Sequence, residues 1–302
     1  MFNKEVKSVF DLKKAFPDEQ TCIEHLEVIR WNGNVVSPFD ATSKVYKCRG
    51  NKYQCKNTNR YFNVKTDTLF DNTKMPLQKW FLAIFLITSH KEGISSLQLG
   101  RDLNITQKSA WFLLQRIRAC FGIENNNQLE SEVEIDETFI GGSDKNRHAN
   151  KKKKGGQGGT QHTSVLGMVE RLGEVNTMKV KNRQSTTIIP QILDVVSEEA
   201  TVYTNEFKGC RSLNKVYNPS VVKRKAHEYV KDRIHTNTIE GFCTLLKRRI
   251  LEIYHFTSEK RIQKYVDEFV FRYYIRSIST SNRIDLMFSN MTNRLTYKEL
   301  IG

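Results

Sequence analysis

The order of strands and helices expected in the second half of this 302-residue chain constrains its fold most. Residues 132–140 alternate between polar and apolar side chains and end at Gly141 and Gly142, which predicts a half-buried strand. The elements expected after it are strands at 164–170 and 175–180, a helix at 187–196 and a strand at 200–204. Three strands followed by a helix and another strand are typical of a mixed α/β sheet.

The last third of the chain has helical spacing. Residues 236–250 and 260–277 predict two helices, which we expect to flank the sheet. The apolar positions of the second are Tyr265, Phe269, Val270 and Tyr273. A polar break at 125–128 indicates a domain boundary before the first strand.

The first 70 residues mix short polar turns with aromatic side chains. Residues 45–48 and 53–55 predict two short strands around a turn at 49–51, and hence a small β-ribbon module. From Pro76 the pattern becomes helical, and the nearly continuous apolar run at 77–88 predicts a buried helix.

Two short helices joined by a tight turn are expected next. The first begins at Ser95, the turn covers 103–105, and Thr106 caps the second. The open face of the second helix is expected to carry Gln107, Lys108, Gln115, Arg116 and Arg118. This pattern matches a helix-turn-helix, whose second helix can lie in the major groove of DNA. An ordinary helical hairpin has the same spacing, which therefore does not separate the two readings.

The net charge narrows the choice of partner. The formal value of +15 favours a polyanion such as nucleic acid or an anionic membrane, with a merely basic soluble protein as the alternative. We expect no membrane insertion, because the longest apolar run, at 80–88, is far shorter than the about 20 residues of a spanning helix. The first residues do not have the apolar core of a secretory signal, and six cysteines without paired spacing favour reduced thiols in a cytoplasm.

A basic, glycine-rich loop is expected at 143–163. It contains four consecutive lysines at 151–154, followed by glycines. A run of this kind is either simply solvated or, where DNA passes nearby, in contact with phosphates.

Several carboxylates have the placement that phosphodiester chemistry needs. Two Mg²⁺ ions about 4 Å apart stabilise the attacking and leaving oxygens, and they require hard carboxylate ligands. Asp136 lies within the strand at 132–140, although a surface Asp flanked by Glu134 and Glu137 has the same pattern. Glu240 and Lys247 are seven residues apart and share a helix face, as does many a surface pair without a role.

Three longer strings resemble the bacterial insertion-sequence transposases of the ISXO type. They cover residues 135–142, residues 235–242 with Leu245 to Arg248, and residues 265–273. The resemblance implies an RNase H-like, integrase-like α/β domain with an Asp-Asp-Glu triad, preceded by a zinc ribbon and a helix-turn-helix. The domains expected on this basis are a degenerate zinc-ribbon-like module at 1–70, a helix-turn-helix region at 74–124, a catalytic domain at 129–280 with the basic loop, and a C-terminal tail at 281–302.

By position, the resemblance gives Asp136 as the first carboxylate, Glu240 as the third, and Lys247 as a catalytic lysine. It implies two Mg²⁺ or Mn²⁺ ions held at positions 136, 205 and 240, and attack on DNA by water and then by the freed 3′-hydroxyl. The expected DNA contacts are Gln107, Lys108, Arg116, Arg118, Arg248 and Arg249. The implied partner is double-stranded DNA, bound by a homo-oligomer in a bacterial cytoplasm, associated with the nucleoid.

The sequence departs from the family at the middle carboxylate, where it has Asn205. A neutral amide is a poor bridge between two divalent ions, and Glu206 beside it would face the other way on a strand. We therefore expect a catalytically impaired transposase, through decay, deliberate substitution or conversion to a DNA-binding role. The alternatives are a non-catalytic DNA-binding protein and an RNA-directed nuclease of the same fold class.

The zinc ribbon departs as well. The two Cys-x-x-Cys pairs of the family read Ser37 to Asp40 and Cys55 to Thr58 here, so Cys55 alone remains, with Cys48 nearby. Because structural zinc requires four ligands, we expect none. The ribbon is expected to be held instead by packing of Tyr46, Tyr53, Tyr61 and Phe62. Two smaller departures are Cys243 in place of Trp and Tyr274 in place of Asn.

Overall fold

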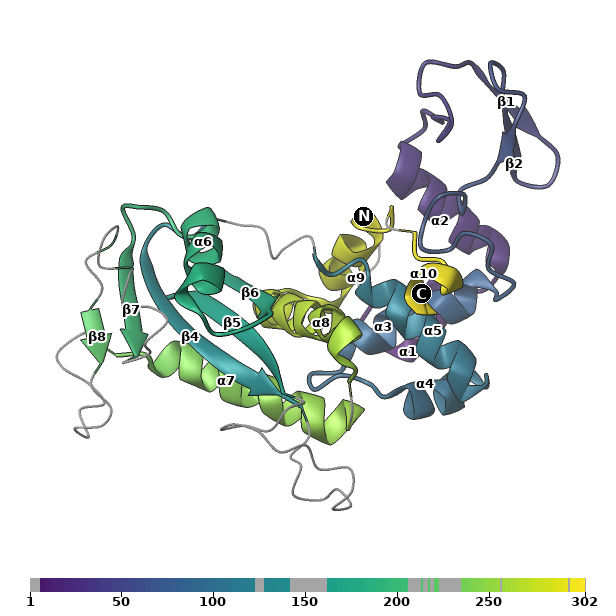
Figure 1. Ribbon diagram of the computed structural model, residues 1–302. Coiled ribbons are helices and arrows are strands. Elements are labelled where there is room, and N and C mark those ends of the chain that lie inside the picture. Colours follow the sequence, from purple (N-terminus) through teal and green to yellow (C-terminus); the bar gives the residue numbers. More distant parts are fainter. Residues whose placement is uncertain are drawn as a thin grey trace. The chain divides into compact units, whose positions relative to one another are not determined.

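The computed structural model describes residues 6–122, 128–141, 162–205, 213, 217, 220–222, 235–255, 257–292 and 294–301, with only the backbone at 205 and 220–222. The chain divides into two compact units (Figure 1). Unit 1 comprises Met1–Phe121 and Ile275–Gly302, and unit 2 comprises Gly122–Tyr274. No helix within the described segments is both long and apolar enough to span a membrane.

Unit 2 is built on a five-stranded mixed sheet, as the element order predicts. Its strands are β4 (Glu132–Ile140), β5 (Thr163–Glu170), β6 (Val175–Val180), β7 (Thr201–Asn205) and β8 (Ser220–Val222). The order across the sheet is β6-β5-β4-β7-β8 (Figure 1). Strand β5 is antiparallel to β4 and β6, whereas β7 is parallel to β4 and β8. The expectation of a mixed α/β fold is therefore confirmed.

Helices cover both faces of this sheet (Figure 1). Helix α6 (Ser185–Val195) packs on one face, where Val133 and Ile135 belong to its apolar cluster. Helices α7 (Asn237–Arg249) and α8 (Ile262–Tyr274) pack on the other. Alternate residues of β4 are directed to opposite faces, so one strand supplies both cores.

A glycine on β5 allows α7 to lie close to the sheet. Gly167 is opposite Asp136 in the antiparallel ladder. A Cβ atom added there would be 2.9 Å from Ile239 Cδ1 and 3.8 Å from Cys243 Sγ, both on α7. After α7 the chain continues into a π-helical turn, η6 (Ile250–Tyr254), and a 3₁₀ turn, η7 (Glu259–Arg261), that leads into α8.

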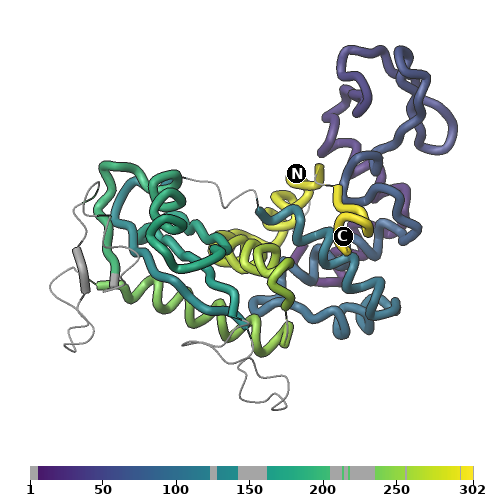
Figure 2. The backbone as a smooth tube through the Cα atoms, in the orientation of Figure 1, coloured from purple at the N-terminus to yellow at the C-terminus, as the bar shows by residue number. Residues whose placement is uncertain are grey.

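Unit 1 consists of helices and a small three-stranded ribbon. From the N-terminal segment it has α1 (Val9–Ala15), α2 (Glu19–Trp31), β1 (Val45–Cys48), β2 (Lys52–Cys55), β3 (Tyr61–Phe62), α3 (Leu77–Ser89), α4 (Ser96–Leu103) and α5 (Gln107–Arg118). From the C-terminal segment it has η8 (Ile275–Ser277), α9 (Thr280–Ser289) and α10 (Tyr297–Ile301). Figure 2 shows this C-terminal segment, in yellow, among the N-terminal helices.

The residues expected as a C-terminal tail are thus helical and join the core of unit 1. Phe288 of α9 is fully buried, and its ring lies 4.7 Å from that of Phe81 on α3. The backbone N–H of Leu69 donates to the carbonyl oxygen of Met291 at 2.8 Å. These contacts join the two ends of the sequence in one hydrophobic core.

The ribbon strands pair antiparallel in the order β1-β2-β3. Tyr53 and Phe62 are buried, and both rings pack against Trp31 of α2. Tyr46 and Tyr61 are exposed, so the expectation that they hold the ribbon together is wrong. The role falls to Trp31 because α2, which the sequence pattern did not indicate, covers the sheet.

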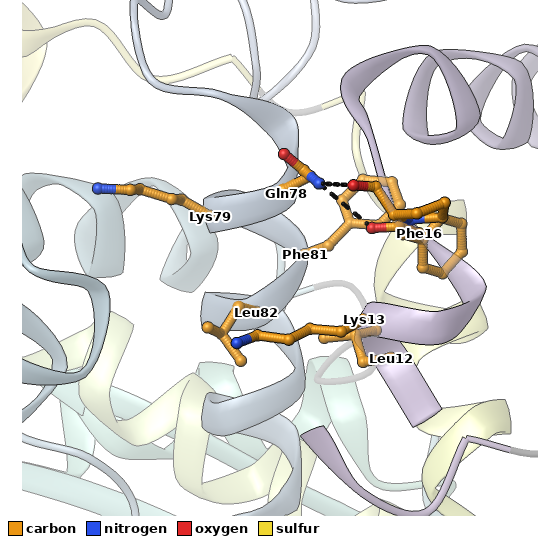
Figure 3. A pocket seen from close by; sticks show the side chains of 8 residues that line it. Leu12, Lys13, Phe16, Gln78, Lys79, Phe81 and Leu82 are labelled. Atoms are coloured by element: carbon orange, nitrogen blue, oxygen red, sulfur yellow. Dashed lines mark hydrogen bonds between the residues drawn. The ribbon is translucent and has the colours of Figure 1, made fainter. Parts of the chain in front are cut away.

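A shallow pocket of about 300 Å³ lies between α1 and α3 (Figure 3). Its wall includes Leu12, Phe16 and Phe81, and the side-chain amide of Gln78 donates to the carbonyl oxygen of Pro17 at 2.6 Å. This lining contains none of the residues expected to contact DNA or metal.

Candidate active site

Asp136 lies in the middle of β4, on the face covered by α7. Its carboxylate is half-buried, and Oδ1 accepts a hydrogen bond from the backbone N–H of Glu137 at 2.9 Å. The flanking acids do not form a solvated face with it. Glu134 is fully buried, and Glu137 pairs with Arg183 on the opposite face of the sheet with only 5% of its side chain exposed. Burial, partly offset by Arg183, raises the pKa of the Glu137 carboxyl.

Helix α7 presents Glu240, Cys243 and Lys247 at helical spacing. Glu240 is half-buried in the first turn, where its Oε1 accepts a hydrogen bond from the Thr236 hydroxyl at 2.8 Å. Lys247 is exposed in the last turn. Residues three, four and seven apart lie along one side of a helix, so these groups share the side that faces β4 and β5.

The buried thiol of Cys243 lies close enough to the charged side chains of the site to be affected by each of them. Its residue is 5% exposed, and burial is the main cause that raises its pKa to about 12. The negative charges of Asp136 and Glu240 act in the same direction, while Lys247 opposes them. Asp136, Glu240 and Lys247 therefore all act electrostatically on one buried atom. We call these three residues and Cys243 the carboxylate cluster.

Asn205 is the last residue of β7. Thr204 pairs with Ile135 in the parallel ladder, so the backbone of Asn205 follows at the level of Asp136. Glu206 lies outside the described residues. The three positions named from the resemblance are thus on adjacent strands and on the helix packed over them, although the structure describes the side chains of only two.

A buried ion pair beside the cluster was missed from the sequence. Glu134 accepts hydrogen bonds from the backbone N–H groups of Thr238 and Ile239 at 2.9 and 3.0 Å, and from Arg171 Nε at 2.7 Å. Alternation along β4 placed Glu134 on the same face as Asp136, which was the available signal. Its partners come from elements distant in sequence, and local patterns carry no information on them.

The helical pair α4–α5 forms as the sequence predicts. Ser95 and Thr106 cap the two helices through side-chain oxygens that accept from the backbone N–H groups of Gln98 and Ser109. Gln107 and Lys108 are exposed on the first turn of α5, and the side-chain amide of Gln107 donates to the Ser96 hydroxyl at 3.0 Å.

Arg116 and Arg118 do not lie on the open face of α5, so this expectation is wrong. They are 5% and 1% exposed, and Gln115, which precedes Arg116, is also buried. Arg116 donates to the carbonyl oxygen of Asp71 at 2.8 Å, and its guanidinium lies 5.4 Å from the centre of the Trp80 ring. The backbone carbonyl and the aromatic ring stabilise this buried guanidinium, although its Nε has no hydrogen-bond partner among the described residues.

The other expected DNA contacts are placed differently. Arg248 is exposed on α7, whereas Arg249 is half-buried with its guanidinium 4.9 Å from the centre of the Phe269 ring. Most of the basic loop at 143–163, including its four lysines, lies outside the described residues.

In the ribbon, hydroxyl groups surround Cys55 at the positions where the family has zinc ligands. Burial tends to raise the pKa of this thiol, but hydrogen bonds from Ser37, Ser43 and Thr58 outweigh it and lower the pKa to about 6. Asp40, the fourth position, accepts instead from Asn57 Nδ2 at 2.7 Å. Among the described residues there is no group of three His, Cys, Asp or Glu side chains arranged to hold a metal.

Comparison with known proteins finds similarity to insertion-sequence proteins. The family model of the ISXO2-like transposase domain matches residues 128–274, which include the whole carboxylate cluster. The chain is also 27% identical over 274 residues to an uncharacterized protein in the transposable element ISH50 of Halobacterium salinarum, covering 86% of this chain and 92% of that protein. Residues 128–274 thus match an ISXO2-like transposase domain, and the chain is similar along most of its length to a protein of an insertion-sequence element.

Proposed function

We propose that the protein binds the ends of its own insertion sequence, and that unit 2 is an RNase H-like domain built to cleave and transfer DNA strands. The observation that carries this proposal is the carboxylate cluster, in which α7, the helix that bears Glu240 and Lys247, packs on the strand β4 that bears Asp136. The sheet order, with three antiparallel strands followed by two parallel ones, supports the RNase H-like assignment.

The cluster suits a hard divalent cation. Asp136 and Glu240 supply carboxylate oxygens, which Mg²⁺ and Mn²⁺ prefer, and both raise the pKa of Cys243 through their negative charge. The thiol of Cys243 is a soft donor, which Mg²⁺ and Mn²⁺ do not prefer to carboxylate oxygens. Asp136 and Glu240 would hold the cation, with the Asn205 amide as a neutral third donor. Such a cation supplies Lewis-acid stabilisation to the phosphate under attack.

The chain's own cations would bind and orient the DNA. Lys247 and Arg248 are exposed in the last turn of α7, about two helical turns beyond Glu240. There they would contact phosphates next to the reacting bond. In unit 1, the exposed Gln107 and Lys108 would form the reading edge of a helix-turn-helix with α5 in the major groove. We expect the active complex to be a homo-oligomer on paired DNA ends.

Asn205 limits the activity. It stands at the end of β7, beside the strand that carries Asp136, and brings an amide where the resemblance expects a carboxylate. Without that charge a second divalent ion is held weakly. We propose that the chain as given binds DNA and cleaves it poorly.

The test is strand cleavage of duplexes taken from the DNA on both sides of the gene, in Mg²⁺ and in Mn²⁺. Asn205→Asp is expected to raise the cleavage rate by about 100-fold or more, the scale on which a lost electrostatic stabiliser acts. Glu240→Gln in the Asn205→Asp chain should abolish the gain. Equal cleavage by the parent and the Asp form would show that position 205 is not the missing ligand.

A non-catalytic DNA-binding protein is the second candidate, favoured by Asn205 itself. Both candidates predict binding that weakens steeply with salt, because lysine and arginine contacts release counterions. If Asn205→Asp binds the duplexes and leaves them intact in both metals, the second candidate is correct. If neither chain binds these duplexes, the proposed function is wrong.

A further inference from the structure

We propose that Glu134 is a positioning residue: its buried carboxylate fixes the start of α7 to β4 and so sets the distance between Glu240 and Asp136. The inference rests on the proposed function for its purpose. It adds a residue that neither touches DNA nor holds the metal.

The hydrogen bonds at the start of α7 carry the inference. The first backbone N–H groups of a helix need an acceptor, which the N-cap side chain usually provides. Here the N-cap residue is Thr236, and its hydroxyl makes no capping bond but donates to Glu240 Oε1 at 2.8 Å. The carboxylate of Glu134 takes its place and accepts from Thr238 and Ile239 through one oxygen, Oε2.

The hydrogen bonds from Thr238 and Ile239 to Glu134, which we call the clamp, lie close in sequence to both acids of the site. Glu134 is two residues before Asp136 on the same face of β4, and Ile239 is immediately before Glu240. A negative charge at the positive end of the helix dipole adds to these hydrogen bonds. The bonds therefore connect the two carboxylate-bearing elements within two residues of each acid.

Arg171 extends the clamp to the strand that ends at Asn205. Its Nε donates to Glu134, and one terminal nitrogen donates to the carbonyl oxygen of His235 at 2.8 Å, just before α7. Its guanidinium lies 4.1 Å from the centre of the Tyr203 ring on β7.

Glu132 closes the network between β4 and β7. The Tyr203 hydroxyl donates to Glu132 Oε1 at 2.9 Å, and Arg171 donates to Glu132 Oε2 at 3.1 Å. One network, buried at Glu134 and partly exposed at Glu132, thus reaches all three elements on which the positions 136, 205 and 240 lie.

A buried ion pair on the other face of β4 provides a matched control. Glu137 has only 5% of its side chain exposed, pairs with Arg183, and lies on the face of β4 that packs against α6 and not against α7. Replacing either acid by Gln removes one buried charge from the same strand. A purely structural role predicts that the two variants differ only in stability.

The experiment compares Glu134→Gln and Glu134→Ala with Glu137→Gln and Glu137→Ala in the full-length chain carrying Asn205→Asp. Hydrogen exchange at the amides of Thr238 and Ile239 is measured first, under conditions where all four variants are folded. We expect exchange to be faster by about tenfold or more in the Glu134 variants, as loss of a charged acceptor implies, and unchanged in the Glu137 variants.

Mn²⁺ affinity, measured by electron paramagnetic resonance, is the second readout. Loss of a residue that orients a metal ligand lowers metal affinity by about 10- to 100-fold, so the Glu134 variants should bind Mn²⁺ more weakly by that factor. Excess Mn²⁺ should then restore most of the cleavage by Glu134→Gln, which separates metal binding from the chemical step.

Two results decide the inference. Equal amide exchange and equal Mn²⁺ affinity in the Glu134 and Glu137 variants would overturn it, even where stability falls. If the reference chain itself neither binds Mn²⁺ nor cleaves DNA, the proposed function fails, while hydrogen exchange still shows whether Glu134 holds α7. If Glu134→Ala does not fold, the decision rests on the Gln pair.

Discussion

Two cysteines of this chain show how strongly the surroundings set the chemistry of a residue. The thiol of Cys55 has its pKa lowered to about 6, because hydroxyl donors from Ser37, Ser43 and Thr58 outweigh burial. The thiol of Cys243 has its pKa raised to about 12 by burial and by two carboxylates. The sequence identified Cys55 as the one remaining cysteine of the expected zinc-ligand set and Cys243 as a departure from the family. It did not give the opposite directions of their pKa shifts, because the groups that cause them come together only in the fold.

The shift at Cys55 predicts a pH-dependent stability of unit 1. The folded pKa lies below the value of about 8.5 for an unfolded cysteine, so the folded state binds fewer protons between these values. The stabilisation is fully present above the unfolded pKa and is lost as the pH falls through about 6. We expect Cys55→Ala to flatten this rise in stability between pH 6 and pH 9.

The stability of unit 1 at each pH is measured by tryptophan fluorescence in urea, because Trp31, Trp80 and Trp111 all belong to unit 1. The control is Cys48→Ala, a half-exposed cysteine of the same ribbon, which should keep the pH slope of the parent chain. An unchanged slope in Cys55→Ala would mean that the thiol stays protonated in the folded state.

At the scale of elements, local signals predicted the helices from α3 to α8 but not α1, α2, α9 or α10, and they predicted contacts poorly. Ser95 and Thr106 indicated the starts of α4 and α5, because a cap is made within four residues of the helix start. The outward placement of Arg116 was wrong, since its acceptor on Asp71 is 45 residues away. Glu134 accepts from Thr238, which is more than 100 residues away in sequence, and no periodic pattern in the sequence indicates that contact.

The packing of α7 on the sheet leads to a prediction from two glycines of unit 2. In Gly167→Ala the added Cβ meets Ile239 Cδ1 at 2.9 Å, so the Ile239 side chain or α7 must shift, and we expect a loss of about 1–3 kcal/mol in the free energy of unfolding. At Gly241, on α7 itself, a Cβ meets no described atom within 4 Å. Gly241→Ala should therefore be neutral or stabilise by up to about 1 kcal/mol through helix propensity.

The rate at which Cys243 becomes labelled in urea reports the separation of α7 from the sheet, read by mass spectrometry of its peptide. Faster labelling in Gly167→Ala and unchanged labelling in Gly241→Ala are expected. Equal labelling in both variants would show that α7 does not depend on the close approach at Gly167.

At the scale of the whole molecule, the chain is not a row of consecutive domains. Unit 2 is inserted between the two segments of unit 1. The backbone N–H of Val6 donates to the Ser281 hydroxyl at 2.8 Å, across 275 residues of sequence. Amphipathic spacing can indicate a helix at the C-terminal end, but it does not say which core that helix joins. For this reason residues 281–302 were expected to be a tail.

This arrangement makes α9 part of the stability of unit 1. Phe288 is 0% exposed and packs against Phe81 and the ring of His25, so Phe288→Ala removes a large side chain from a closed core. We expect a loss of about 3–5 kcal/mol, measured by tryptophan fluorescence in urea. Phe10→Ala is the control, because that ring is 85% exposed and its removal should cost less than about 0.5 kcal/mol. A loss below about 1 kcal/mol in Phe288→Ala would mean that unit 1 is complete without its C-terminal segment, since removal of a well-packed core phenylalanine costs several times more.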